Sequence, residues 1–389
     1  MYSHRLLKLV LASIALVCIA CGRPSEEPAI SAARGGTVTP VTVTSNAHVP
    51  LTIKPLPTQA AAEPAALPLP TMDIPVPAVF TSTLLAHYVE PQTYLTDMCG
   101  YLRAKWDPSR SSPGTIVVPI MFHSVKEGGT FRPGDTSIPV GDLNRITQTA
   151  RELGFQTITI PELVGFLEYN CRIPPRSMIW IVDDRRPQML KDYFLPIARE
   201  NGWTISLGWI VGNTTWIDGL WKTLEVWQSE GVVDVQSHGL EHRYLTESTP
   251  DDVIREELSG SLGAFHNHLG IKPVAYVWPG GNYSSRALEL AREAGYRVAF
   301  TVNSRGPLMY NWIPLFEREI ELGDPLMLLP RYWASPSLPE QLRNAAAIGE
   351  NAARKALEDY RQDALYYQVH CGCELPPPPD GKGTGEPLE

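Results

Sequence analysis

The sequence has no surplus of basic residues. Lys and Arg together number 33 against 42 Asp and Glu, which gives a formal net charge of −9 at pH 7. Proteins that bind nucleic acids need an excess of cations to neutralise phosphates, so this balance argues against nucleic acid as the main partner. The sequence also shows no internal repeat. Its hydrophobic content of 43% is that of a soluble globular protein.

The longest hydrophobic run is too short to span a bilayer comfortably. It extends from Leu9 to Ile19 and follows the basic residues Arg5 and Lys8. A positive segment followed by a short apolar run is the pattern of a secretory signal. We therefore expect residues 1–21 to direct export, so that the mature protein acts outside the cytoplasm.

The end of this run carries a possible lipidation site. Ile19-Ala20-Cys21-Gly22 resembles a bacterial lipobox, in which the cysteine is lipidated and becomes the new N-terminus, although Cys18 stands where Leu is usual. We expect Cys21 to carry two acyl chains, which would anchor the protein stably to the outer side of a membrane. An ordinary secretory signal cut nearby is the alternative.

Cysteine is scarce, with six in 389 residues. Beyond the signal region four remain, which are Cys99, Cys171, Cys371 and Cys373. Their spacing lacks the C-x-x-C pattern of a zinc ribbon. Disulfides persist in oxidising compartments, and four cysteines allow three pairings. We expect Cys371 or Cys373 to reach Cys99 or Cys171 and so to tie a terminal segment to the domain.

Proline, at 36 residues, is too frequent for a chain that is packed throughout. Residues 22–83 are rich in Pro, Ala, Thr and Ser with almost no aromatics before the end, which predicts a disordered tether. Aromatic residues return in 84–113, where we expect a short helical lead-in. Residues 337–370 read as a C-terminal helical segment, and 371–389 as a disordered Pro/Gly tail.

Strand-like and helix-like segments alternate through residues 114–336. The strand-like segments are 115–122, 155–160, 177–182, 203–211, 232–236, 274–278 and 297–302. The helix-like segments are 143–153, 161–168, 187–200, 220–229, 250–269 and 284–294. This β-α repetition predicts a parallel sheet covered by helices on its outer face. With about seven strands, we expect a distorted (β/α) barrel, closed or nearly closed, rather than an open sheet.

Four short motifs lie where predicted strands end, which is where functional groups collect in parallel α/β architectures. They are Phe122-His123-Ser124, Asp183-Asp184, Ser237 to His242, and Trp278-Pro279-Gly280-Gly281. Two adjacent carboxylates at a strand end repel each other and lose water, which is costly unless a cation or a function compensates. A helix N-cap at Asp184 is the simpler interpretation of that pair.

The histidine motif favours a functional interpretation of the acidic motif. His238 and His242 are spaced to present two imidazoles to one ion, from a helical turn or a tight loop. One Asp and two His leave open positions for water and substrate, which is the composition of a catalytic zinc site. The neighbouring Asp is then available to accept a proton.

In order and spacing, these motifs resemble those of the polysaccharide deacetylases with NodB homology, over roughly Thr115 to Trp333. The family's acidic, histidine and groove-lining motifs correspond here to Ile181–Arg185, His238–His242 and Trp278–Gly281. The surroundings Pro119–His123 and Glu152–Phe155 look most like the branch of poly-N-acetylglucosamine deacetylases. Two positions depart from the pattern: Arg185 replaces a glycine, and no arginine precedes Trp278.

The resemblance implies a role for each matching residue. Asp183 would be the general base, and His123 the acid that protonates the departing amine. The metal ligands would be Asp184, His238 and His242. The substrate-binding residues would be Trp278, Pro279, Gly280 and Arg331, and either Arg185 or Arg331 would replace the missing arginine electrostatically.

The implied activity is that of a metal-dependent hydrolase removing N-acetyl groups from a cell-surface or extracellular N-acetylglucosamine-containing polysaccharide. The implied cofactor is a divalent metal; zinc fits the ligand set, although cobalt, nickel or iron would bind it too. Two alternatives stay open. One is a catalytically inactive carbohydrate-binding lipoprotein, which the replacement of the family's glycine by Arg185 leaves open. The other is an O-acetyl esterase acting on an acetylated polysaccharide.

Overall fold

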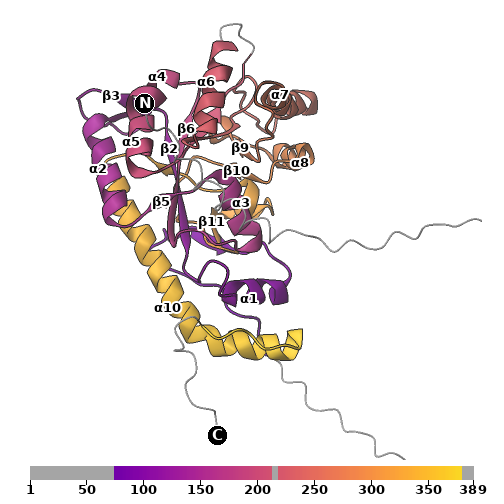
Figure 1. Ribbon diagram of the computed structural model, residues 1–389. Helices are drawn as coiled ribbons and strands as arrows, with labels where there is room; N and C mark the ends of the chain where they lie inside the picture. Colours follow the sequence, from indigo (N-terminus) through magenta and orange to yellow (C-terminus); the bar gives the residue numbers. More distant parts are fainter. Residues whose placement is uncertain (1–73, 213–217, 379–389) are drawn as a thin grey trace, which may run out of the picture. The chain divides into compact units, whose positions relative to one another are not determined.

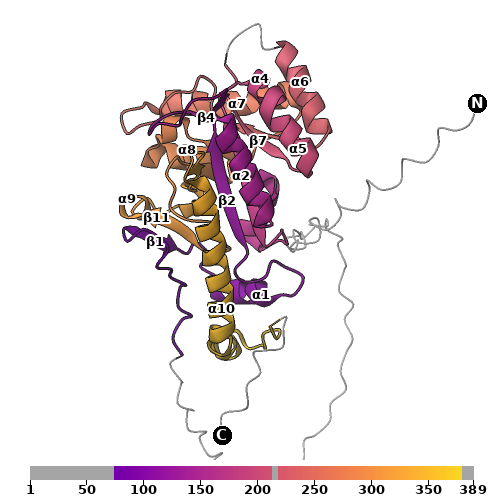
Figure 2. The same cartoon turned by 90° about the vertical axis from the view of Figure 1, so that its left-hand side faces the viewer.

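The computed structural model describes residues 74–212 and 218–378 (Figures 1 and 2). The predicted signal peptide, the lipidation site Cys21 and residues 22–73 of the predicted tether lie outside this part of the chain. Within the described ranges, no helix combines the length and the apolar character needed to cross a membrane.

A curled parallel sheet forms the centre of the fold. Within the described part of the chain it has eight strands: seven in the order β10-β9-β8-β7-β6-β2-β12, and β5 paired with the start of β6. Their bounds are β2 Ile116–Phe122, β5 Gln156–Thr157, β6 Arg176–Asp183, β7 Ile205–Trp209, β8 Val233–Ser237, β9 Ala275–Val277, β10 Val298–Phe300 and β12 Tyr332–Trp333. A bridge between Phe300 and Leu329 joins β10 to the segment leading into β12. The sheet therefore curls into the expected distorted barrel of seven parallel strands.

Helices surround this sheet, as Figure 1 shows. They are α2 Val140–Glu152, α3 Ile160–Tyr169, α4 Pro187–Met189, α5 Leu195–Asn201, α6 Asp218–Ser229, α7 Asp251–Leu269 and α8 Ser285–Ala294. The sequence predicts one helix over 187–200, but a π-helical turn at Leu190–Phe194 separates α4 from α5. Pro196 lies in the first turn of α5, and it lacks the amide donor that an uninterrupted α-helix would need there.

Strand β6 is apolar along almost its whole length because both of its faces are buried. Alternate side chains enter two different cores: Met178, Trp180 and Val182 join one, and Ile179 and Ile181 join the other. A strand covered on both faces cannot show the polar–apolar alternation of a half-exposed strand. The strand thus stays buried up to its last residue, Asp183, which is one of the predicted site residues.

The N-terminal flank of the barrel is more extensively packed than expected. The predicted lead-in contains helix α1 (Met98–Trp106), but also strand β1 (Val89–Gln92), which pairs antiparallel with β11 (Ile313–Phe316). Residues 74–83, assigned to the tether, also lie on the domain: Ile74 is buried, and the Trp312 Nε1 donates to the Phe80 carbonyl at 2.8 Å. The tether prediction is wrong for these ten residues, because Ile74 and Phe80 pack on the domain, although Val76 and Val79 stay exposed.

The predicted tail is wrong in a similar way up to residue 378. The long helix α10 (Leu338–Cys371) runs along α2 and β2 before it reaches α1 (Figures 1 and 2). Beyond it, Leu375 is buried, and the Tyr360 hydroxyl donates to the Pro376 carbonyl at 3.0 Å. The remaining described elements are β3 Ser124–Lys126, β4 Ser137–Pro139, α9 Glu317–Ile320 and short 3₁₀ turns at Pro279–Gly281 and Pro325–Met327.

A disulfide joins Cys99 in α1 to Cys371 at the end of α10, across 272 residues of sequence. This confirms the expected link between a terminal segment and the domain. The two helices also share an apolar cluster that includes Trp106 and Tyr367, and the Trp106 Nε1 donates to Asp363 at 2.9 Å.

We expect Cys99→Ser to lower the free energy of unfolding by about 2–4 kcal/mol, because the unfolded chain would lose its longest covalent constraint. Chemical denaturation under oxidising conditions measures the change. Cys373→Ser is the matched control, since Cys373 is exposed and lies outside the disulfide. Equal denaturation midpoints for the Cys99 variant and the wild type would show that the link adds nothing to stability.

Candidate active site

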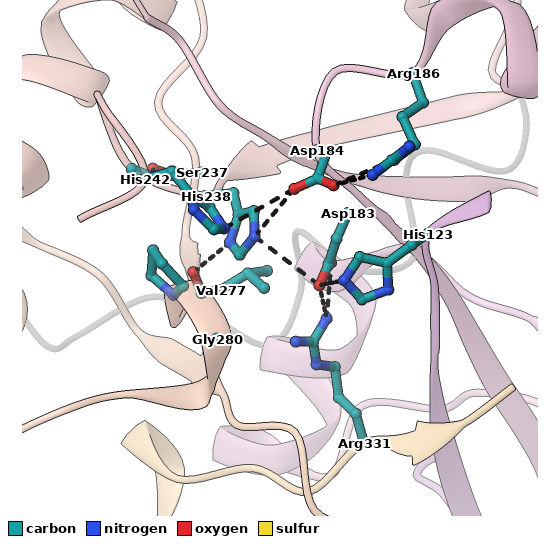
Figure 3. A network of polar contacts seen from close by, with 12 residues as sticks. His123, Asp183, Asp184, Arg186, Ser237, His238, His242, Val277, Gly280 and Arg331 are labelled. Carbon is teal, nitrogen blue, oxygen red and sulfur yellow. Dashed lines mark hydrogen bonds and ion pairs between the residues drawn. The ribbon is translucent and has the colours of Figure 1, made fainter. Parts of the chain in front are cut away.

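The predicted site residues come together at one end of the barrel. His123 follows β2, Asp183 ends β6 and is followed by Asp184, and His238 follows β8. Figure 3 shows the Asp184 carboxylate facing the rings of His238 and His242, while Asp183 lies between His123 and Arg331. Because the strands are parallel, their carboxyl ends meet at the same edge, and residues far apart in sequence become neighbours there.

Asp184, His238 and His242 form a group that could hold a cation. One ligand atom from each lies within 4.8 Å of the others, and both histidine Nε2 atoms are 3.9 Å from Asp184 Oδ1. The His238 Nδ1 lies 2.7 Å from the Val277 carbonyl, which can only accept, so Nδ1 carries the proton and Nε2 presents its lone pair. Burial lowers the pKa of His238 to about 4, which keeps the ring neutral. A neutral imidazole is the form that binds metals, so the residues fit a divalent cation.

Backbone conformation places these ligands. The chain from His238 to His242 is a tight loop rather than a helical turn, with Gly239 at φ 90° and His242 at φ 61°. Asp184 is left-handed too, at φ 68°, a conformation that Asp tolerates better than most residues. It does not cap the following helix, whose N-cap is Arg186. The interpretation of Asp184 as a helix N-cap is therefore wrong.

Arg185 does not distort this turn. The left-handed position is Asp184, so the side chain that replaces the family's glycine does not occupy a strained backbone conformation. The Arg185 guanidinium instead donates to the Val211 carbonyl at 3.3 Å, and it lies so close to Gly212 that a Cβ there would be 2.6 Å from Nη1. The Arg185 side chain thus forms a hydrogen bond with the backbone of the segment that follows β7.

Asp183 is buried with a cation at its side. It is 1% exposed, and the Nη1 of Arg331, itself 0% exposed, lies 2.8 and 2.9 Å from its two oxygens. Burial by itself raises the pKa of the Asp183 carboxyl, but Arg331, His238 and His123 outweigh it and hold the pKa below its ordinary value. The group is therefore an ionised acceptor at neutral pH. A Cβ at Gly208 in β7 would lie 2.9 Å from Asp183 Oδ1, so a side chain at this position would displace the carboxylate.

His123 faces the same carboxylate from the end of β2. Its Nε2 lies 3.8 Å from Asp183 Oδ2, and its ring stacks on Trp333 with centroids 6.1 Å apart. Burial lowers the pKa of His123, against the opposing effect of Asp183. The imidazole can therefore exchange a proton with groups in the site while its ring is held in place.

The expected substrate-binding residues are mostly not at the surface. Trp278 and Arg331 are 0% exposed, and the Trp278 indole donates to the Met327 carbonyl at 2.9 Å. Pro279 is buried as well, whereas Gly280 is exposed. The large apolar area of the Trp278 indole is covered in the core, and the Arg331 guanidinium bonds to Asp183. That Trp278, Pro279 and Arg331 contact substrate stays a prediction.

Two neighbours of the ligand group were missed from the sequence. Arg186 donates to Asp184 Oδ2 from Nη2 at 2.7 Å and from Nε at 3.1 Å, which leaves Oδ1 toward the histidines. Its position two residues after Asp184 was the available signal. Tyr244 is 56% exposed, with its ring centroid 5.9 Å from that of His242 and its edge against Gly280. No motif marked this tyrosine.

Comparison with known families agrees with this geometry. Residues 172–299 match the sequence model of the family described as polysaccharide deacetylase. This stretch of the chain is therefore similar to the polysaccharide deacetylases. The matched segment contains Asp183, Asp184, His238 and His242. No protein with a curated description matches the sequence.

Solved structures of several deacetylases are similar to this one. The Streptococcus pyogenes deacetylase PplD, solved with acetate, is 17% identical, with 59% of this chain and 98% of that chain covered and a TM-score of 0.48. IcaB from Ammonifex degensii is 16% identical, with 60% and 97% covered and a TM-score of 0.48. A de-N-acetylase from Aggregatibacter actinomycetemcomitans is 14% identical, with 57% and 95% covered and a TM-score of 0.45.

Proposed function

We propose that this protein is a metal-dependent hydrolase that removes N-acetyl groups from an N-acetylglucosamine-containing polysaccharide outside the cytoplasm. The observation that carries the proposal is the clustering of Asp184, His238 and His242 within 4.8 Å, with the ionised carboxylate of Asp183 4.0 Å from His238 Nε2. A carbohydrate-binding module has no need for such a set, which weighs against an inactive protein.

Each side chain then has a task in hydrolysis. A divalent cation held by Asp184, His238 and His242 supplies Lewis acidity toward the acetyl carbonyl, and zinc suits these ligands. Asp183 accepts the proton of the attacking water, and Arg331 keeps it ionised for that purpose. As the carbon–nitrogen bond breaks, one water is consumed, acetate leaves, and the amine nitrogen takes up a proton.

His123 is the group we assign to protonate that amine. Because burial lowers its pKa, the ring is neutral at neutral pH and must receive the proton before it can give it away. Asp183, 3.8 Å from His123 Nε2, is the acid that faces it after water has been deprotonated. The proton can thus travel from water to amine through two residues that are both in the site.

The choice of an amide rather than an ester substrate rests on the motifs Pro119–His123 and Glu152–Phe155, which resemble the poly-N-acetylglucosamine branch. We also propose that the protein is exported and anchored at Cys21, on the strength of the lipobox-like residues 19–22. Incorporation of labelled palmitate by the wild type, but not by Cys21→Ser, tests the anchor.

Acetate release from a panel of glycans tests the proposed activity. The panel contains poly-N-acetylglucosamine, chitin oligomers, peptidoglycan glycan strands and acetylated xylan, each assayed with and without a chelator. We expect release from the N-acetylated glycans that the chelator abolishes and added zinc restores. Release from acetylated xylan alone would indicate an O-acetyl esterase. No chelator-sensitive release from any member would favour the inactive binding protein.

A further inference from the structure

A buried carboxylate lies beneath the loop that joins the two histidines. Glu257 of α7 is 1% exposed, and its oxygens accept the backbone N–H of Leu240 at 2.9 Å and of Glu241 at 3.0 and 3.1 Å. Leu240 and Glu241 are two of the three residues between His238 and His242. The carboxylate therefore holds the middle of the segment whose ends present the two imidazoles.

The conformation of this loop creates the need for an anion. Because His238 to His242 is not a helix, the amides of Leu240 and Glu241 have no partner four residues earlier and point toward the protein interior. Buried N–H groups without acceptors are costly, and consecutive amides pointing the same way form an anion-binding concavity. Gly239 makes room for the acceptor: a Cβ there would lie 2.6 Å from Glu257 Oε2.

Helix stability does not account for a charge at this position. The buried face of α7 consists of Ile254, Glu257, Leu258, Ser261 and Phe265, so Glu257 occupies a position where an apolar side chain is expected. The nearest cation in the described chain, Arg243, is 51% exposed and its Nε is 3.4 Å away, so solvent weakens this pair. Burial raises the pKa of Glu257 and the loop amides oppose that effect, which means that the loop provides much of what keeps the carboxylate charged.

We propose that Glu257 is a positioning residue for the cation site: it fixes the His238–His242 loop so that both Nε2 atoms lie within reach of Asp184 before a cation binds. The inference rests on the proposed function, because it assumes that these three residues hold a metal. It assigns to Glu257 no contact with substrate or with the cation itself.

Glu257→Gln tests the inference through metal affinity rather than catalysis. Glutamine has nearly the same size, but only one of its two terminal atoms accepts, so an N–H of the side chain would face an N–H of the loop. We expect the zinc affinity of the metal-free protein to fall about 10- to 100-fold. Competition with a chromophoric chelator measures it, and the absorption spectrum of bound cobalt reports the ligand geometry. Glu256→Gln, one residue away and exposed, should leave both readouts unchanged.

Unchanged zinc affinity and cobalt spectrum in a folded Glu257→Gln protein would overturn the inference and leave the proposed function standing. If the wild type itself binds no zinc, the proposed function and the inference fail together. Amide hydrogen exchange of the metal-free wild type serves if the variant does not fold. The Leu240 and Glu241 amides should then exchange slowly, and exchange as fast as at the exposed Gly128 and Gly129 would refute their capture by Glu257.

Discussion

Asp183→Asn is expected to reduce acetate release by about 10²- to 10⁴-fold, which is the usual contribution of a general base. Asparagine keeps the shape of the side chain and can still accept a hydrogen bond from Arg331, but it cannot take a proton from water. The zinc content should not change, because Asp183 is not among the three grouped ligands. Rate measurements on the best substrate of the panel, together with metal analysis, check both statements.

Asp192→Asn is the matched control for this substitution. Asp192 is exposed in the π-helical turn after α4, and its carboxylate accepts hydrogen bonds from the Gln188 side chain. It should retain full activity. An Asp183→Asn enzyme that works within a few-fold of the wild type would mean that another group removes the proton, and the mechanism proposed here would have to be abandoned.

Arg331→Met is expected to destabilise the folded protein by about 3–5 kcal/mol, because it leaves the Asp183 carboxylate buried without its cation. Both partners are almost completely buried, so solvent cannot compensate. Chemical denaturation measures the loss. Arg343→Met in α10 is the control: it breaks an exposed pair with Glu340, for which we expect about 0–1 kcal/mol. A similar small effect for both variants would show that the buried pair does not contribute as described.

The same variant should shift the pH dependence of the reaction. Burial raises the pKa of Asp183 and Arg331 is the main opposing influence, so removing Arg331 raises that pKa. A base works only when deprotonated; hence the acid limb of the kcat/KM profile should move to higher pH. If the residual activity of Arg331→Met keeps the acid limb of the wild type, Asp183 is not the group that titrates there.

Much of the fold follows from local sequence patterns. The uninterrupted apolar run before Asp183 indicates a strand buried on both faces, and β6 is such a strand. The alternation of strands and helices indicates a parallel sheet, and parallel strands bring their carboxyl ends to one edge. For this reason the sequence alone was sufficient to expect Asp184, His238 and His242 in one place, and the structure brings them together.

The surroundings of the site could not be predicted in this way. Two arginines were equal candidates for the cation beside Asp183: Arg185, two residues away, bonds to Val211, and Arg331, 148 residues away, makes the ion pair. Trp278 belongs to a motif that predicts a groove-lining residue, yet its side chain is buried. Glu257 is one of several acidic residues in α7, and only its hydrogen bond from the Leu240 amide distinguishes it.

The sequence by itself therefore determined six of the seven strands in the main order of the barrel and the side chains that end them, since periodicity and burial are properties of single segments. It did not predict β12, and the predicted strand 155–160 is reduced to the two-residue β5. Only the tertiary structure decided which cation accompanies Asp183, which aromatic ring reaches solvent, which cysteines pair and which buried acid holds the histidine loop. Those contacts depend on where distant segments come to lie once the sheet has curled, and no local pattern records that placement.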